Sequence, residues 1–236
     1  LGNRELFTPD GQPLYDVDWQ DLLTRTAISQ SHNLSFTGGS DKSNYGLYLG
    51  YYDDQGIIVN SFQKRYSARA VIDHNVRDWL KVGGTLGFSN NTERRQDDGV
   101  GGNIPPRMMI EMVPFIPYQY PDGTYGRRED YNGLETGDNP RAQADEITRL
   151  YRRNVFTGNT YAKITLMEGL DFTSTIGVNL KDENQPYFVS TLSNFDGGLG
   201  RAFARIDAMS SFFWQWSNHI NYNKTFGDHS ISATLG

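Results

Sequence analysis

Residues 65–89 read RYSARAVIDHNVRDWLKVGGTLGFS and hold two alternating runs with a tight turn at Arg77-Asp78. In the first run the even positions from Tyr66 to Ile72 are apolar, and most odd positions are polar. In the second run the even positions from Leu80 to Phe88 are apolar or glycine, and the odd ones are polar or glycine. Side chains of a β-strand alternate between the two faces of a sheet. The stretch therefore predicts an antiparallel hairpin with one apolar and one polar face.

The same alternation recurs on both sides of this hairpin. The further runs are Asn33 to Gly38, Asn44 to Tyr52, Phe156 to Leu166, Leu170 to Leu180, Ile206 to Tyr222 and a run after His229. Together they predict about eight antiparallel strands and an all-β fold.

The predicted connections alternate between short and long. Tight turns are expected at 39–43, 77–78, 168–169 and 225–228, and long connections at 53–64, 92–155 and 181–200. Outer-membrane β-barrels have short turns at the periplasmic end and long loops outside. The pattern thus favours a segment of an antiparallel transmembrane β-barrel with long outer loops.

Aromatic residues at the ends of an apolar stripe support a membrane barrel. Tyr45 and Tyr51 are six positions apart, roughly 20 Å in a strand, and aromatic girdles flank an apolar band of about 25 Å. A soluble β-sandwich, such as a carbohydrate-binding module, would bury the same stripes in its core. A complete eight-stranded barrel is a third interpretation. It is disfavoured because the chain stops at Gly236 within an alternating run, and we expect both ends to be cuts in a longer protein.

Composition excludes several classes of protein. The 236 residues contain no Cys, which removes disulfides, thiol nucleophiles and thiolate metal sites. The formal net charge is -6 and the chain has no basic tract, so we do not expect contact with nucleic acid. The long connections carry some helix, expected at 17–27, at 106–112 and from Asn139-Pro140, an N-cap followed by Pro, to about Arg153.

Several short stretches, in order, resemble one family of transporters. They are Asp18-Trp19-Gln20-Asp21, Arg25-Thr26-Ala27, His32-Asn33-Leu34-Ser35, Gly38-Gly39, the stretch from Tyr51 to Ile58, Arg65-Tyr66-Ser67-Ala68-Arg69 and the stretch from Asp78 to Gly83. A weaker likeness continues through Val113 to Pro117 and Pro121 to Gly126. This set resembles the early barrel region of SusC/RagA-type TonB-linked outer-membrane transporters.

The resemblance implies both an architecture and a function. Members have a plug domain and a barrel of the 22-stranded transporter kind, in the outer membrane of a Gram-negative bacterium. They import oligosaccharides or peptides with energy supplied through TonB, and a SusD-type surface lipoprotein closes the outer mouth. Residues 1–236 would then be about eight strands of that barrel, without the plug, and residues 1–30 and 92–155 would be outer loops.

No enzyme motif emerges, and we expect neither catalysis nor a cofactor. The four His residues are scattered, without a pair at metal-ligand spacing. Oxygen ligands for calcium at Asp97, Asp98, Asp130, Asn132, Glu135 and Asp138 match no loop motif. The glycines Gly99, Gly101 and Gly102 lack the context of a phosphate-binding loop.

One cluster in the loop at 92–155 is a candidate contact site. Tyr118, Tyr120, Asp122, Tyr125 and Arg127 combine aromatic faces, which stack on sugar rings or peptide groups, with charges that bind polar edges. They would touch the substrate or a partner protein, or simply pack the loop.

Charged residues on the predicted polar face form a second candidate set. They are Arg65, Arg69, Asp73, Lys81, Lys163 and Asp171. In a closed barrel they would hold a plug by ion pairs or merely wet the lumen.

Overall fold

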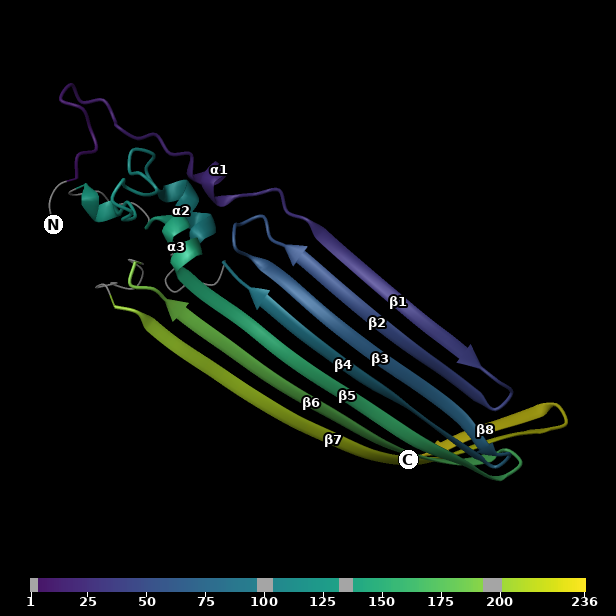
Figure 1. Cartoon of the computed structure of the whole chain (residues 1–236). Coiled ribbons are helices and arrows are strands. Elements are labelled where there is room, and N and C mark those ends of the chain that lie inside the picture. Colours follow the sequence, from purple (N-terminus) through teal and green to yellow (C-terminus); the bar gives the residue numbers. More distant parts are fainter. Residues whose placement is uncertain (1–3, 97–103, 132–137, 193–200) are drawn as a thin grey trace.

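Eight strands form one antiparallel sheet in which each strand pairs with its sequence neighbours (Figure 1). The computed structural model describes residues 4–96, 104–131, 138–192 and 201–236. The strands are β1 (Ser29–Gly39), β2 (Ser43–Gln55), β3 (Phe62–Arg77), β4 (Leu80–Arg94), β5 (Ile147–Met167), β6 (Leu170–Val189), β7 (Phe203–Phe226) and β8 (His229–Leu235). The predicted all-β antiparallel class is confirmed.

One face of the sheet is apolar across all the central strands. Ala70 pairs with Leu47 on one side and with Leu86 on the other. Two positions along, one row runs from Phe88 through Phe156, Leu180 and Phe212. These side chains are exposed in the single-layered sheet, since Leu86 is 55% and Phe212 65% accessible.

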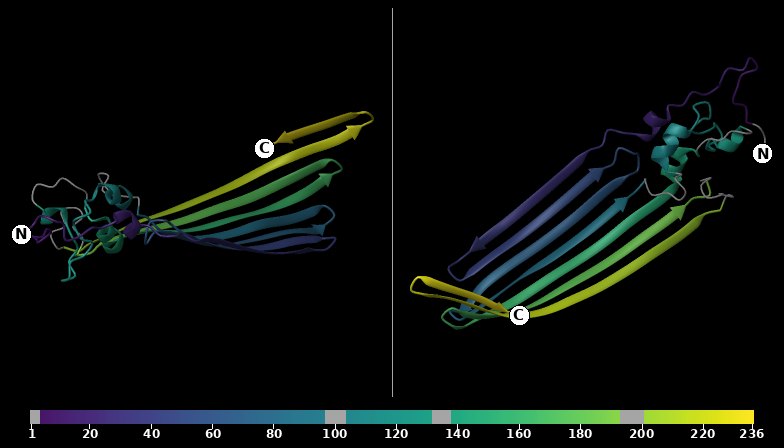
Figure 2. Two further views of the ribbon diagram at one scale, coloured as in Figure 1. Left: turned by 90° about the horizontal axis from the view of Figure 1, so that it is seen from above. Right: turned by 180° about the vertical axis from the view of Figure 1, so that it is seen from behind.

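The sheet is curved and no second sheet covers it among the described residues (Figure 2). A β-sandwich is therefore excluded for this part of the chain, because a sandwich packs two sheets face to face. The edge strands β1 and β8 do not pair with each other. The described strands thus do not close into a small eight-stranded barrel.

The two ends of the sheet differ as predicted. One end has only short turns, including the two residues between β5 and β6, where Gly169 has a φ of +80°. A side chain at Gly169 would also collide with the Asn223 carbonyl, so this turn requires glycine. At the other end the long connections gather with all the described helices (Figure 1). None of those helices has the length and apolarity needed to cross a membrane.

The strands are longer at the loop end than their apolar stripes predict. The three expected long connections were too long. The one at 53–64 is shortened because β2 ends at Gln55 and β3 begins at Phe62. The one at 92–155 loses residues to β4, which ends at Arg94, and to β5, which begins at Ile147, and the one at 181–200 loses residues to β6, which ends at Val189. The loop expected at 1–30 likewise gives way to β1 at Ser29. Backbone pairing continues here between polar residues, as in Thr92 with Arg152 and Arg152 with Asn184. Hydrophobic periodicity marks the apolar band, not the full hydrogen-bonded ladder.

The described helices are α1 (Trp19–Leu23), α2 (Pro105–Glu111), the 3-10 turn η2 (Arg128–Asp130) and α3 (Pro140–Glu146). The helix predicted at 106–112 is found within one residue of its expected bounds, whereas the other two predicted helices are shorter than expected. The predicted helix from Asn139 to Arg153 was wrong beyond Glu146, because Ile147 and Thr148 pair with Val189 and Phe188 in the sheet. The one expected at 17–27 ends early, because Thr24 is extended and the Arg25 amide donates to the Ile57 carbonyl at 2.8 Å.

Candidate functional site

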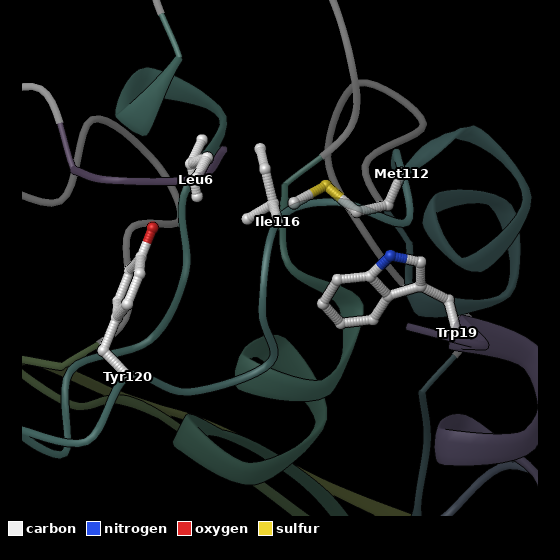
Figure 3. Close-up of a cluster of buried hydrophobic side chains, with 5 residues drawn as sticks. All are labelled: Leu6, Trp19, Met112, Ile116 and Tyr120. Carbon is white, nitrogen blue, oxygen red and sulfur yellow. The ribbon is translucent and has the colours of Figure 1, made fainter. Parts of the chain in front are cut away.

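Segments far apart in the sequence pack together at the loop end of the sheet. We call residues 4–24, 104–131 and 138–146 the loop module. Its core gathers Leu6, Trp19, Met112, Ile116 and Tyr120, all at most 6% exposed (Figure 3). The Trp19 indole N–H donates to the Val113 carbonyl at 2.9 Å. The module therefore has a small hydrophobic core of its own.

Asn139 joins the helix α3 to the rest of the loop module. Its side-chain oxygen accepts from the amides of Arg141 and Ala142, which caps the helix. Its side-chain nitrogen donates to the carbonyls of Tyr118 and Gly126, at 2.9 and 3.0 Å. One buried amide thus fixes the helix start and the tyrosine-bearing segment together.

The structure brings the three predicted tyrosines together and largely buries them. Tyr120 is 6% and Tyr125 9% exposed, and the rings of Tyr118 and Tyr125 lie 5.6 Å apart. Their hydroxyls donate to carboxylates: Tyr118 to Asp145, Tyr120 to Asp130 and Tyr125 to Glu146, at 2.7 to 3.0 Å. Burial, followed by the nearby carboxylates, raises the pKa of Tyr120 and of Tyr125 above the usual value. The hydroxyls therefore stay protonated at neutral pH and act as fixed donors inside the module.

The two charged members of the predicted cluster occupy different settings. Asp122 has a half-exposed side chain that accepts from the Thr124 hydroxyl and amide and pairs with Arg4 at 2.8 Å. These hydrogen bonds, the Thr124 ones foremost, lower the pKa of Asp122 to about 2. Arg127 precedes η2, and its amide donates to the Asp130 carboxylate at 2.8 Å. Asp122 thus remains ionised at any physiological pH.

Three side chains tie the loop module to the strand ends. Asn60, Arg94 and Gln96 all donate to the Ala144 carbonyl, at 3.1, 3.0 and 3.2 Å. Arg94 donates also to the Ile147 carbonyl. The module is therefore held to the β2–β3 connection and to β4 as well as through its own chain.

The polar face of the sheet carries the second predicted set. Asp73 accepts from the Tyr161 hydroxyl at 2.5 Å and lies 3.9 Å from Lys81, while Lys163 pairs with Asp171 at 2.8 Å. Arg69 helps line a hollow of about 450 Å³ on β1 to β5, and the Arg65 guanidinium lies 5.5 Å from the Tyr52 ring. Four of the six predicted residues thus pair within the sheet.

Sequence reasoning missed a row of large residues at the loop end of the polar face. Arg149, Tyr187 and Arg205 lie side by side on β5, β6 and β7. Arg95, one residue past the end of β4, donates its amide to the Arg149 carbonyl. They are far apart in the sequence, and three of them fell in segments expected to be loops. Only the strand pairing could have revealed the row.

The candidate metal and phosphate sites receive no support. Asp97, Asp98, Gly99, Gly101, Gly102, Asn132 and Glu135 lie outside the described residues. Two calcium candidates are described: Asp130 accepts a hydrogen bond from the Tyr120 hydroxyl, and the Asp138 carboxylate lies 3.6 Å from the Arg128 guanidinium. Within the part of the chain that the structure describes, no group of three or more acidic or His residues could hold a metal ion.

Comparisons with known proteins agree with this architecture. TonB-dependent receptor P3 of Formosa agariphila is 27% identical over 94% of the chain, and the TonB-dependent receptor SusC of Bacteroides thetaiotaomicron is 26% identical over 94%. The chain resembles SusC-type TonB-dependent receptors. It spans less than a quarter of the length of these relatives, 22% and 24% respectively. No family model matches the chain.

Solved structures show the same fold. The RagAB peptide transporter matches with a TM-score of 0.76 at 21% identity, covering 93% of this chain and 25% of that one. The same importer in its open-open state matches with a TM-score of 0.74. The sheet therefore has the fold of part of this transporter. The matched relatives are receptors and transporters, not enzymes.

Proposed function

We propose that the chain is part of the β-barrel of a TonB-dependent nutrient importer in the outer membrane of a Gram-negative bacterium. The single observation that carries this proposal is the sheet itself, with one face apolar across its central strands and the other polar. A barrel in lipid needs that division, because alternate residues face the acyl chains and the lumen. Similarity to TonB-dependent receptors supports the direction and energy source of transport.

In this proposal residues 1–236 belong to the barrel domain. The end with short turns faces the periplasm, and the loop module lies at the outer mouth, in keeping with the asymmetry of bacterial barrels. The lumen-facing side would be the polar face, with Asp73, Lys81, Lys163 and Asp171 among its charges. A part of the protein outside these residues would make the contact with TonB.

We further propose that the loop module meets the cargo or a SusD-like surface lipoprotein that closes the mouth. The cargo would be an oligosaccharide or a peptide, and the similarity in fold to the RagAB peptide transporter supports the second of these. Tyr118, Tyr120 and Tyr125 would shape the contact surface from within, because their hydroxyls are bonded inside the module. Asp122, with its half-exposed side chain, and Arg127 would then be the residues that touch a ligand or partner.

The test compares two variants in the full-length transporter. Replacing both Asp122 and Arg127 with Ala leaves the tyrosine network intact, and we expect it to lower substrate uptake or co-purification of the lipoprotein by roughly tenfold, as when a contact of about 1.4 kcal/mol is lost. The matched control is Arg107→Ala with Glu111→Ala, which removes an exposed ion pair from α2 of the same module. Wild-type uptake and co-purification in the Asp122/Arg127 variant would show that the assigned contact site is wrong.

A further inference from the structure

One arginine on the polar face of the sheet has no carboxylate partner among the described residues. Arg69 lies near the middle of β3, between the ends of that strand at Phe62 and Arg77, and its side chain is exposed. Tyr48 on β2 and Gly87 on β4 are its direct neighbours across the sheet, and neither carries a charge. The positive charge of Arg69 is therefore not balanced within the described part of the chain.

Two lysines on the same face show the contrast. Lys81 lies 3.9 Å from the carboxylate of Asp73, and Lys163 lies 2.8 Å from that of Asp171. Asp73 is also the nearest acidic residue to Arg69 along this face of β3, but it is four positions away, roughly 13 Å in a strand. The sheet thus supplies acidic partners for these lysines and none for Arg69.

Arg69 borders a hollow whose floor consists of small residues. The hollow has a volume of about 450 Å³ and is lined, beside the arginine, by Gly50, Ser67, Gly87 and Ser89. A Cβ atom at position 50 would lie 2.6 Å from the Ser67 side-chain oxygen, so glycine there leaves room for that hydroxyl. The Ser67 and Ser89 hydroxyls form no hydrogen bond with another described residue. Arg69 and two unused hydroxyls therefore lie around one open space.

A carboxylate is the group that this set of side chains binds best. A guanidinium group binds a carboxylate through two parallel N–H···O bonds, and serine hydroxyls can donate to its remaining lone pairs. Ionised side chains within the depth of a membrane are costly unless they pair or reach water. Arg69 lies at that depth in the proposed barrel, because its neighbour Ala70 belongs to the apolar band between Leu47 and Leu86. An acidic partner would offset this cost.

In the proposed barrel, that partner comes from chain outside residues 1–236. The strands β1 and β8 do not pair with each other, and an open sheet edge is not stable in lipid, so further strands must close the barrel. A barrel wider than eight strands has a lumen that is either an open channel or filled by a plug. The chain spans 22% and 24% of its relatives P3 and SusC, so most of such a protein lies outside it. That remainder is long enough to supply both the missing strands and a plug.

We propose that Arg69, with Ser67 and Ser89, binds an Asp or Glu side chain of a plug, a part of the same protein that fills the barrel lumen. The inference rests on the proposed function and names the place where the barrel wall holds that plug. An imported cargo passes the wall only briefly, whereas a plug stays there and balances the charge of Arg69 at rest. A carboxylate of a cargo is the alternative occupant, and the experiment distinguishes the two.

The experiment uses Arg69→Lys in the detergent-purified full-length transporter, treated with a water-soluble carbodiimide and no added cargo. The substitution keeps the positive charge at an exposed position, so the fold is retained. The reagent activates a carboxylate, and an amine in contact with it displaces a urea and leaves an amide bond. Mass spectrometry of the digested protein then identifies the acidic residue joined to position 69. We expect one amide bond from position 69 to an Asp or Glu outside residues 1–236.

Two controls come from the same chain. Lys163 and Asp171, 2.8 Å apart on the polar face, should be joined in every sample, which shows that the reagent enters the lumen. Arg152 pairs with Thr92 and Asn184 on the opposite face of the sheet. Arg152→Lys therefore places the same amine outside the lumen, and it should form no bond to a residue beyond 1–236.

Three results would overturn the inference. Position 69 would be joined only to residues within 1–236, joined to co-purified cargo, or joined to nothing in a sample in which Lys163 and Asp171 are joined. None of these results bears on the import proposal, because the cross-link is formed without TonB and without transport. Import itself is tested separately, by loss of TonB-dependent uptake when the transporter is deleted.

Discussion

At the scale of single residues, Gly83 shows how strands β3 to β5 are locked together. The Tyr161 ring on β5 lies across Gly83 on β4 and reaches Asp73 on β3 with a hydrogen bond of 2.5 Å. A Cβ atom at position 83 would collide with the Asp73 carboxylate and lie only 2.6 Å from the Tyr161 ring that bonds it. We expect Gly83→Ala to displace the ring and destabilise the barrel by about 1–3 kcal/mol, the usual cost of overpacking. The measurement is the temperature at which the folded band disappears on a semi-native gel of the full-length protein.

Gly177 offers a control on the same face. A Cβ atom there would meet nothing closer than 3.9 Å, so Gly177→Ala should leave the unfolding temperature nearly unchanged. Tyr161→Phe should cost less than Gly83→Ala, about 1 kcal/mol, because it keeps the ring and loses only the bond to Asp73. Equal unfolding temperatures for the two glycine variants would refute the role of Tyr161 as a cross-strand lock.

At the scale of elements, Asn139 both caps the start of α3 and ties the helix to the segment that carries the tyrosines. Asn139→Ala removes the helix cap, worth about 1 kcal/mol, and leaves the Tyr118 and Gly126 carbonyls without that donor. Asn139→Asp keeps the capping oxygen and removes only the donor. We therefore expect protection of residues 104–131 from hydrogen exchange to fall in both variants, and further in Asn139→Ala. Unchanged exchange in Asn139→Asp would mean that the side-chain nitrogen does not hold the tyrosine segment.

The same elements show what sequence can and cannot predict here. The cap at Asn139 and the two faces of β3 and β4 were predicted, because each depends on residues close together in the chain. The end of α3 was not, because Ile147 pairs with Val189, 42 positions away. The row of Arg149, Tyr187 and Arg205 was not predicted for the same reason, since it exists only when β5, β6 and β7 align. Burial of Tyr120 likewise depends on packing with Leu6 and Trp19 from a distant segment.

At the scale of the whole molecule, the exposed apolar face requires a covering, which the proposed function assigns to lipid. Leu86 sits in the middle of this face, between Ala70 and Gly158, whereas its neighbour Thr85 lies on the polar face between Val71 and Asn159. If lipid covers the face, Leu86→Arg in the full-length protein should cost roughly 2–4 kcal/mol near the bilayer midplane. Thr85→Arg should cost much less, because its side chain would enter a wet lumen. Folding into lipid vesicles at a series of urea concentrations measures both. Equal costs for the two variants would mean that lipid covers neither face, and a larger cost for Thr85→Arg would mean that lipid covers the other face. Only a hydrocarbon environment penalises one of these adjacent arginines so much more than the other.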